Sequence, residues 1–200
     1  MGMITSNIAR AFAVVLLLRA SSCKRPHAES LAGTSDSGPG SAFEELVMAD
    51  LRRPFVTDAQ LSERFAQRRA DFEKLIVMAQ ADDLLVRIAP DFTWTTTSMA
   101  WPRPDSQLGF TLERWNAYRR LFQNLGLEAG IMRPSDHPNA IYLIAQTKGL
   151  VTGGSSKGYA YSDTPLEPLC QSLDQGKART QSRICFKPLN GKWYLYLEWD

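Results

Sequence analysis

The stretch Ser182-Arg-Ile-Cys-Phe-Lys-Pro-Leu-Asn-Gly-Lys-Trp-Tyr-Leu-Tyr-Leu-Glu-Trp199 holds two β-forming runs around an Asn190-Gly191 pair. Asn-Gly is the favoured pair of a two-residue hairpin turn, because both turn positions need positive φ. The sequence therefore predicts a C-terminal β-hairpin with strands over 182–189 and 192–199.

The last strand has two different faces. Alternation places four large apolar side chains on one face, which we expect to be core: Trp193, Leu195, Leu197 and Trp199. The other face carries Tyr194 and Tyr196, and we expect Tyr159 and Tyr161 of a strand over 158–162 to join them. Tyrosines offer large, rigid contacts with a polar tip, so the four form a candidate partner-binding face. Two alternatives stay open: the helices cover this face, or the tyrosines simply pair across strands.

Two long helical patterns lie upstream of the hairpin. Residues 58–81 carry an apolar stripe at helical spacing, with Asp58 as the expected N-cap. Residues 112–125 carry a second stripe, with Gly126 as the expected C-cap. A short helix over 43–51 should end before Pro54.

Extended patterns separate and follow these helices. Runs over 84–88, 92–96 and 140–147 read as strands, and Gly153–Ser156 reads as a turn. Residues 98–109, with two prolines, are expected to form a loop. The order indicates an α+β domain: two main helices packed on an antiparallel sheet that ends in a C-terminal β-hairpin.

The N-terminus has the parts of an export signal. Residues 1–10 contain one basic residue and no acidic one, an apolar run follows over Ala11–Leu18, and small residues precede Cys23. As a helix the apolar run would span about 12 Å, far less than the ~30 Å of a hydrocarbon core. We therefore expect a signal peptide over 1–22 and no transmembrane anchor.

The sequence Ala20-Ser21-Ser22-Cys23 resembles the lipobox of bacterial lipoproteins, with Ala20 where Leu is usual. The resemblance implies that Cys23 carries a diacylglyceryl group and becomes the first residue of the mature protein. The runs 156–162 and 191–200 also resemble small, uncharacterised lipoproteins of Gram-negative bacteria. Lys24, in place of Asp, then favours an outer-membrane lipoprotein that faces the periplasm. The alternatives are plain secretion into the periplasm and no export.

The chain has three cysteines, an odd number for an exported protein. Lipidation of Cys23 would leave Cys170 and Cys185, which an oxidising compartment would join as a disulfide. The alternative is two buried free thiols. A metal site is disfavoured, because neither His nor further Cys lies near this pair to complete four ligands.

Composition sets the remaining bounds. Residues 24–42 are rich in Gly, Ser and Pro, so residues 23–42 are expected to form a lipidated, disordered tether ahead of a single domain over 43–200. Without Arg10 and Arg19 the mature chain has 21 basic and 21 acidic residues. A neutral balance counts against nucleic acid as a partner, because binding it normally requires a basic excess.

No catalytic motif stands out. The domain contains a single histidine, His137, in a turn-rich stretch. Residues 153–158 do not match the phosphate loop, because no Lys-Ser or Lys-Thr follows Gly158. The sequence indicates no cofactor and leans against an enzyme. We expect a membrane-tethered module that binds another envelope protein, as an inhibitor, immunity or accessory factor; the alternative is a small hydrolase of cell-wall or lipid substrates.

Overall fold

The computed structural model describes residues 45, 48–49, 52–96, 99–100, 108–150, 153–174 and 183–199. The chain divides into two units, residues 1–53 with 150–152 and residues 54–149 with 153–200. The expected signal peptide, Cys23, the tether and the boundary at residue 43 lie outside the described residues. Within the expected helix over 43–51, residues 45 and 48–49 are described, and they are helical.

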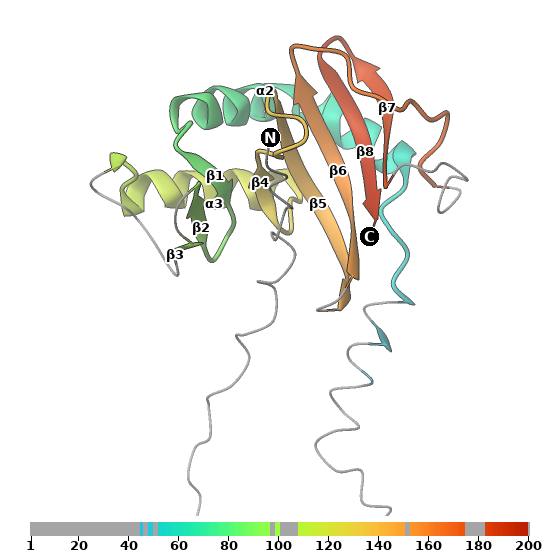
Figure 1. Ribbon diagram of the computed structural model, residues 1–200, viewed down its shortest axis with the longest axis horizontal. Coiled ribbons are helices and arrows are strands. Elements are labelled where there is room, and N and C mark those ends of the chain that lie inside the picture. Colours follow the sequence, from blue (N-terminus) through green and yellow to red (C-terminus); the bar gives the residue numbers. More distant parts are fainter. Residues whose placement is uncertain are drawn as a thin grey trace, which may run out of the picture. The chain divides into compact units, whose positions relative to one another are not determined.

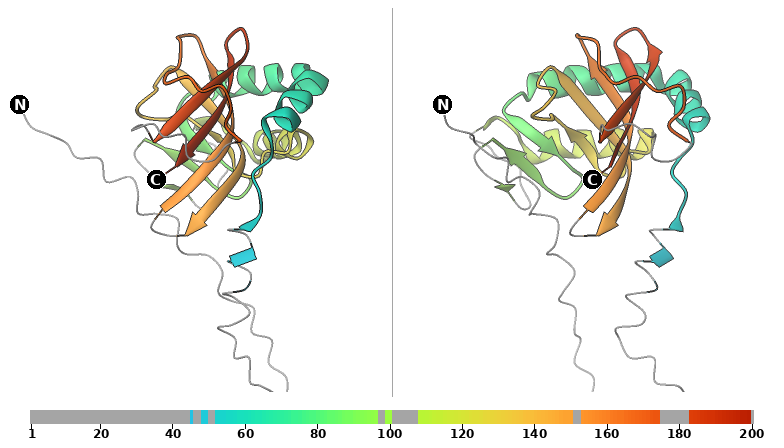
Figure 2. Two further views of the ribbon diagram at one scale, coloured as in Figure 1. Left: turned by 90° about the vertical axis from the view of Figure 1, so that its right-hand side faces the viewer. Right: turned by 45° about the vertical axis from the view of Figure 1, so that its right-hand side comes forward.

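The second unit is an antiparallel sheet with both long helices on one face (Figures 1 and 2). Its eight described strands follow the order β3-β2-β1-β4-β5-β6-β8-β7. The elements in chain order are α2 (Asp58–Ala81), β1 (Leu85–Ile88), β2 (Thr93–Thr95), β3 (Met99–Ala100), α3 (Leu112–Leu125), β4 (Gly130–Met132), β5 (Ala140–Leu150), β6 (Gly153–Ser162), β7 (Ile184–Asn190) and β8 (Trp193–Trp199). The predicted α+β class, with two helices on a sheet and a final hairpin, is confirmed. We call the helix-covered face the inner face and the opposite one the outer face.

Helix α2 has the predicted bounds, but its N-cap is Thr57 and not Asp58. The Thr57 hydroxyl accepts a hydrogen bond from the Gln60 N–H, and the Gln60 side chain accepts one from the Thr57 N–H. This reciprocal capping box satisfies two backbone donors that a helix start leaves unpaired. The carboxylate of Asp58 is therefore available for contacts elsewhere.

Helix α3 also has the predicted bounds and the predicted cap. Gly126 adopts the left-handed conformation, with φ of 60° and ψ of 44°, which a side chain would strain. Arg64 of α2 donates hydrogen bonds from Nη1 to the carbonyls of Leu125 and Gly126, at 3.4 and 3.3 Å. A cation at a helix C-terminus interacts favourably with the helix dipole, so this contact fixes one helix to the other.

The inner face carries the main hydrophobic core. The four predicted apolar side chains of β8 all belong to it: Trp193, Leu195, Leu197 and Trp199. The Phe72 ring of α2 lies 4.5 Å from the ring of Tyr159 and 5.7 Å from that of Trp193. Tilted and edge-on aromatic pairs at such distances stabilise a core beyond their buried area, by about 0.5–1.5 kcal/mol each.

Two predicted turns differ from the structure. The hairpin turn consists of Gly191 and Lys192, because Asn190 still pairs with Trp193 and a register shift lies between Pro188 and Asn190. Residues Gly153–Ser156 are not a turn but the start of β6. Pairing of β6 with β8 over 155–161 outweighs the local turn preference of Gly and Ser, as strand pairing commonly does.

Candidate binding surface on the outer face

The four tyrosines of the expected binding face do not share a face. Residues paired directly across antiparallel strands point to the same side of a sheet. Tyr159 pairs with Leu195, which lies in the inner core, and Tyr161 pairs with Trp193, which also does. Tyr194 and Tyr196 point to the outer face. The prediction of one shared face is therefore wrong, because the register offsets the tyrosines of β6 and β8 by one residue.

Tyr159 has a structural place in the inner core. It is fully buried, and its hydroxyl donates to the carbonyl of Leu61 at 3.0 Å. Burial raises the pKa of this phenol above its usual value. Tyr161 is half-buried, with its ring 5.2 Å from that of Trp193. Neither tyrosine can join a contact surface made by Tyr194 and Tyr196.

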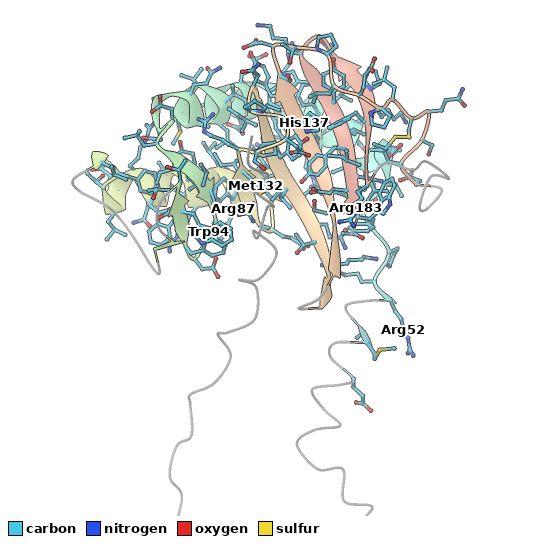
Figure 3. All side chains as sticks on the ribbon, viewed as in Figure 1. Arg52, Arg87, Trp94, Met132, His137 and Arg183 are labelled. Carbon is cyan, nitrogen blue, oxygen red and sulfur yellow. A yellow bond between two sulfur atoms is a disulfide. The ribbon has the colours of Figure 1, made fainter. Side chains whose placement is uncertain are left out.

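A row of residues crosses the outer face, and all of them except a glycine on β6 carry large side chains. Its members are linked by the registers of neighbouring strands, and the stacking of two rings bridges β5 and β8 across β6. From β2 to β7 this outer-face row consists of Trp94, Arg87, Met132, Tyr142, Gly158, Tyr196 and Phe186. Figure 3 shows Arg87, Trp94 and Met132 together on the side of the sheet away from the helices.

Gly158 makes the aromatic half of this row possible. A Cβ at this position would lie 2.1 Å from the carbonyl oxygen of Leu143 on β5, so no larger residue fits. With no side chain on β6 between them, the rings of Tyr142 and Tyr196 stack at 4.6 Å and 27°. Burial raises the pKa of both phenols, which therefore stay neutral at physiological pH.

Polar groups surround the aromatic half of the row. Ser156 Oγ lies 3.3 Å from the Tyr196 hydroxyl and 3.2 Å from Glu198 Oε2. His137 Nδ1 lies 2.9 Å from the Tyr142 hydroxyl, and its ring meets that of Phe186 edge-on at 5.4 Å. Serine and histidine are thus bound to different tyrosines. This arrangement orients the rings and does not form a nucleophile–base pair.

A second polar cluster lies at the start of α2. Asp58 Oδ1 lies 2.8 Å from Lys157 Nζ, and Asp58 Oδ2 lies 3.0 Å from Lys187 Nζ. Lys157 also contacts Asp174, at 2.6 Å, although its side chain is only 1% exposed. The N–H of Leu173 completes the cluster by donating to Asp58 at 2.9 Å. Two carboxylates and two ammonium groups balance in charge, so we assign this cluster to the fold.

The two paired cysteines lie close to this cluster in the sequence. Cys170 comes shortly before Asp174, and Cys185 lies on β7, as Lys187 does. Cys170 and Cys185 are at disulfide distance, with Cα atoms 6.0 Å apart, as the cysteine count predicts. The Cys170 N–H donates to the carbonyl of Phe186 at 2.7 Å, and the Phe186 N–H donates to that of Pro168 at 2.9 Å. The segment before Asp174 is therefore attached to the edge of the sheet by both covalent and hydrogen bonds.

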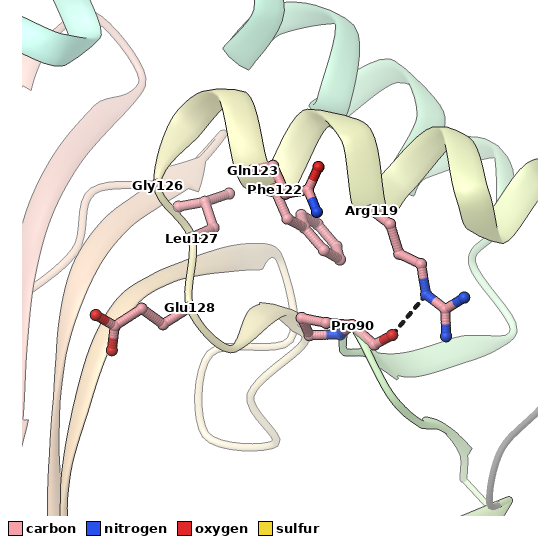
Figure 4. Close-up of a pocket in the computed structure, with 7 residues that line it drawn as sticks. All are labelled: Pro90, Arg119, Phe122, Gln123, Gly126, Leu127 and Glu128. Atoms are coloured by element: carbon pink, nitrogen blue, oxygen red, sulfur yellow. Dashed lines mark hydrogen bonds between the residues drawn. The ribbon is translucent and has the colours of Figure 1, made fainter.

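A groove of about 490 Å³ opens at the C-terminal end of α3 (Figure 4). It is lined by Pro90, Arg119, Phe122, Gln123, Gly126, Leu127 and Glu128. Arg119 donates from Nε to the Pro90 carbonyl at 2.6 Å and stacks 3.8 Å from the ring of Trp115. Its lining contains one carboxylate, so the groove offers an apolar floor but no acid–base pair.

No described group of three or more His, Cys, Asp or Glu could hold a metal ion. No described helix has the length and apolar character needed to span a bilayer. No protein-family model matches the chain, and no similar curated protein or solved structure was found.

Sequence reasoning missed the outer-face row. The row joins residues from seven strands whose order in the sheet is not their order in the chain. The sequence indicated only Tyr196 of this row, together with its neighbour Tyr194, because alternation in β8 places both on the face opposite the core. The position of Gly158 between two strands, and the placement of Arg87 beside Met132, follow from pairings that no local pattern encodes.

Proposed function

We propose that this chain is an exported lipoprotein of a Gram-negative envelope that binds another envelope protein through the outer face of its sheet. The observation that carries the proposal is the pairing of Cys170 with Cys185. It accounts for two of the three cysteines and leaves Cys23, preceded by small residues and an apolar run, as the single thiol to be lipidated. A disulfide is also typical of an oxidising compartment.

The outer face supports binding better than catalysis. Tyr194, Met132 and Trp94 are only half-buried. Met132 and Tyr194 pack against the cluster that holds the buried rings of Tyr142 and Tyr196, and Trp94 lies farther along the row beside Arg87. Large aromatic side chains held rigidly by their neighbours lose little entropy on contact with a partner, which is why they dominate binding energies at interfaces. An inhibitor or an accessory factor would use such a surface.

A small envelope hydrolase has less support. The carboxylates that gather at the start of α2, Asp58 and Asp174, are both paired with lysine. A smaller groove of about 250 Å³ contains Asp163, which pairs with Lys192. A hydrolase would need two carboxylates with separated roles in one cleft, and neither described groove offers that pair.

The test uses the chain with a C-terminal affinity tag in a Gram-negative host. The wild type should sediment with outer membranes, whereas Cys23→Ser should be soluble in the periplasm. After cross-linking, both forms should recover the same stoichiometric partner. Tyr194→Ala should reduce that recovery several-fold, and the matched control Val77→Ala, exposed on α2, should not.

Three results would contradict the proposal. Cys23→Ser could remain on the membrane, or the intact Met1 could be found on a reduced cytoplasmic product. The purified chain could also turn over an envelope substrate while recovering no partner, which would favour the hydrolase.

A further inference from the structure

Arg87 is a buried cation in the outer-face row. Its register partners are Trp94 on β2 and Met132 on β4, and it is only 3% exposed. Arginine is almost never fully buried unless it is paired with an acid. The burial of Arg87 is therefore unusual, because neither of its register partners is acidic.

The described contacts of Arg87 leave most of its donors unused. Nη1 donates to the carbonyl of Ile131 at 3.5 Å, a long hydrogen bond, and the guanidinium lies 5.8 Å from the ring centre of Phe92. Nε is buried without a hydrogen-bond partner. A guanidinium has five N–H donors, so the fold uses only a small part of its capacity.

Within the described parts of the chain, the charge of Arg87 also has no acidic partner. No described carboxylate forms an ion pair with Arg87. Besides burial, the groups that act on its charge are the phenol of Tyr196, which is neutral at physiological pH, and the exposed Asp91. Burial lowers the pKa of Arg87 to about 10, so the group is still charged at neutral pH. A buried, unpaired charge costs several kcal/mol of stability, and a bound anion would reduce this cost by pairing with the charge.

The surroundings define which anion fits. Trp94 and Met132 are half-buried, so the guanidinium lies one side-chain layer below the surface. The ring of Phe92, 5.8 Å from the guanidinium, and the side chain of Met132, its register partner on β4, make its described surroundings largely apolar. A planar guanidinium with Nε and an Nη group unused matches the two oxygens of a carboxylate, and apolar surroundings match an apolar body attached to it.

We propose that Arg87 is the anchor of a binding site for a carboxylate carried on an apolar or aromatic body. The carboxylate takes the unused donors of the guanidinium, and the body lies on the outer-face row beside Trp94 and Met132. A free organic acid and an acidic residue of the partner proposed above share this chemistry. The site itself does not depend on the lipid anchor, and only the second source depends on the proposed partner.

The test measures thermal unfolding of the full chain in its Cys23→Ser form, with benzoate as probe and chloride at matched ionic strength. Benzoate at ten times its Kd should raise the unfolding midpoint by about 3 °C. The rise in the unfolding midpoint should vanish in Arg87→Met. It should be smaller in Arg87→Lys, which keeps the charge but loses the planar pair of donors that binds both carboxylate oxygens. Arg69→Met, exposed on α2, is the matched control and should respond as the wild type does.

A second readout separates a binding role from a structural one. Without benzoate, Arg87→Met should unfold at the same or a higher temperature than the wild type, because it removes an unpaired buried charge. A variant that unfolds at lower temperature or fails to fold would show that the guanidinium supports the fold, and would overturn the proposal. An unchanged benzoate response in Arg87→Met, or none in the wild type, would overturn it as well.

The partner assay then distinguishes the two sources. Loss of the cross-linked partner in Arg87→Met, together with loss of the benzoate response, assigns the carboxylate to the partner. Retention of the partner with loss of the benzoate response assigns it to a free acid. If no partner is recovered from any form, the proposed function fails, while the benzoate measurements still decide the site.

Discussion

Asp58 shows how one side chain can serve a different purpose from the one its position suggests. It stands at a helix start, where a carboxylate commonly caps, yet Thr57 takes the cap and Asp58 binds Lys157 and Lys187. Burial alone would raise the pKa of Asp58, but the Leu173 N–H and the two lysines outweigh it and hold this pKa below its usual value. The residue therefore links α2 to β6 and β7 through charge.

Asp58→Asn should lower the free energy of unfolding by about 3 kcal/mol at pH 7, because it leaves buried Lys157 with one acidic partner fewer. The folded pKa lies below the unfolded value of about 3.9, so the contribution of Asp58 is fully present above pH ~4 and is lost as the pH falls through the folded pKa. The difference between wild type and variant in urea unfolding should thus be the same at pH 7 and pH 5 and smaller at pH 3. Asp71→Asn, more exposed on the same helix, should change stability by less than about 1 kcal/mol. An equal loss at every pH would argue against the charged pair.

Strand β6 depends on Gly158, the first residue of the strand that the sequence predicts over 158–162, just after the expected turn over 153–156. Gly158 lies inside the strand, between Tyr142 and Tyr196, where the backbone of β5 comes close. The helices, by contrast, were predicted with their bounds, because their stripes and the glycine cap of α3 are local signals. Turn composition near β6 was misleading because pairing with β8 decides that segment.

Gly158→Ala should destabilise the domain by about 1–3 kcal/mol, since the added methyl group collides with the Leu143 carbonyl and pushes β5 from β6. The same change should disturb the Tyr142–Tyr196 stack, visible as altered near-ultraviolet circular dichroism. Gly154→Ala is the control on the same strand, where a Cβ would lie 3.2 Å from the Lys148 carbonyl and needs only a small adjustment. If both variants were equally stable, the close approach of the two strands would not constrain the sheet.

In the unit that holds the sheet, a disulfide and an ion cluster link the same segment to distant parts of the chain. The Cys170–Cys185 pair and the ion cluster both attach the segment around 168–174 to β7 and to the start of α2. A 15-residue separation corresponds to about 3 kcal/mol in the chain-entropy account of disulfides. The described part of the connection between β6 and β7, residues 163–174, is thereby restrained.

Cys170→Ser combined with Cys185→Ser should lower the free energy of unfolding by about 3 kcal/mol, and a reductant should bring the wild type to the same value. The reductant should not affect the double variant, and Cys23→Ser alone should leave the unfolding free energy unchanged. Mass spectrometry after alkylation checks the pairing directly. Two thiols alkylated at 170 and 185 without reductant would contradict it.

The sequence by itself determined the two helices, the alternating core face of β8, the final hairpin and the pairing of its two distal cysteines. Each of these follows from residues that are neighbours in the chain or from a count, so local periodicity and cysteine chemistry were sufficient. Only the tertiary structure decided that the tyrosines divide between two faces, that Asp58 meets two lysines, and that Arg87 lies buried beside Met132. Those facts depend on strand order and register, and a shift of one residue in register exchanges every side chain between core and surface.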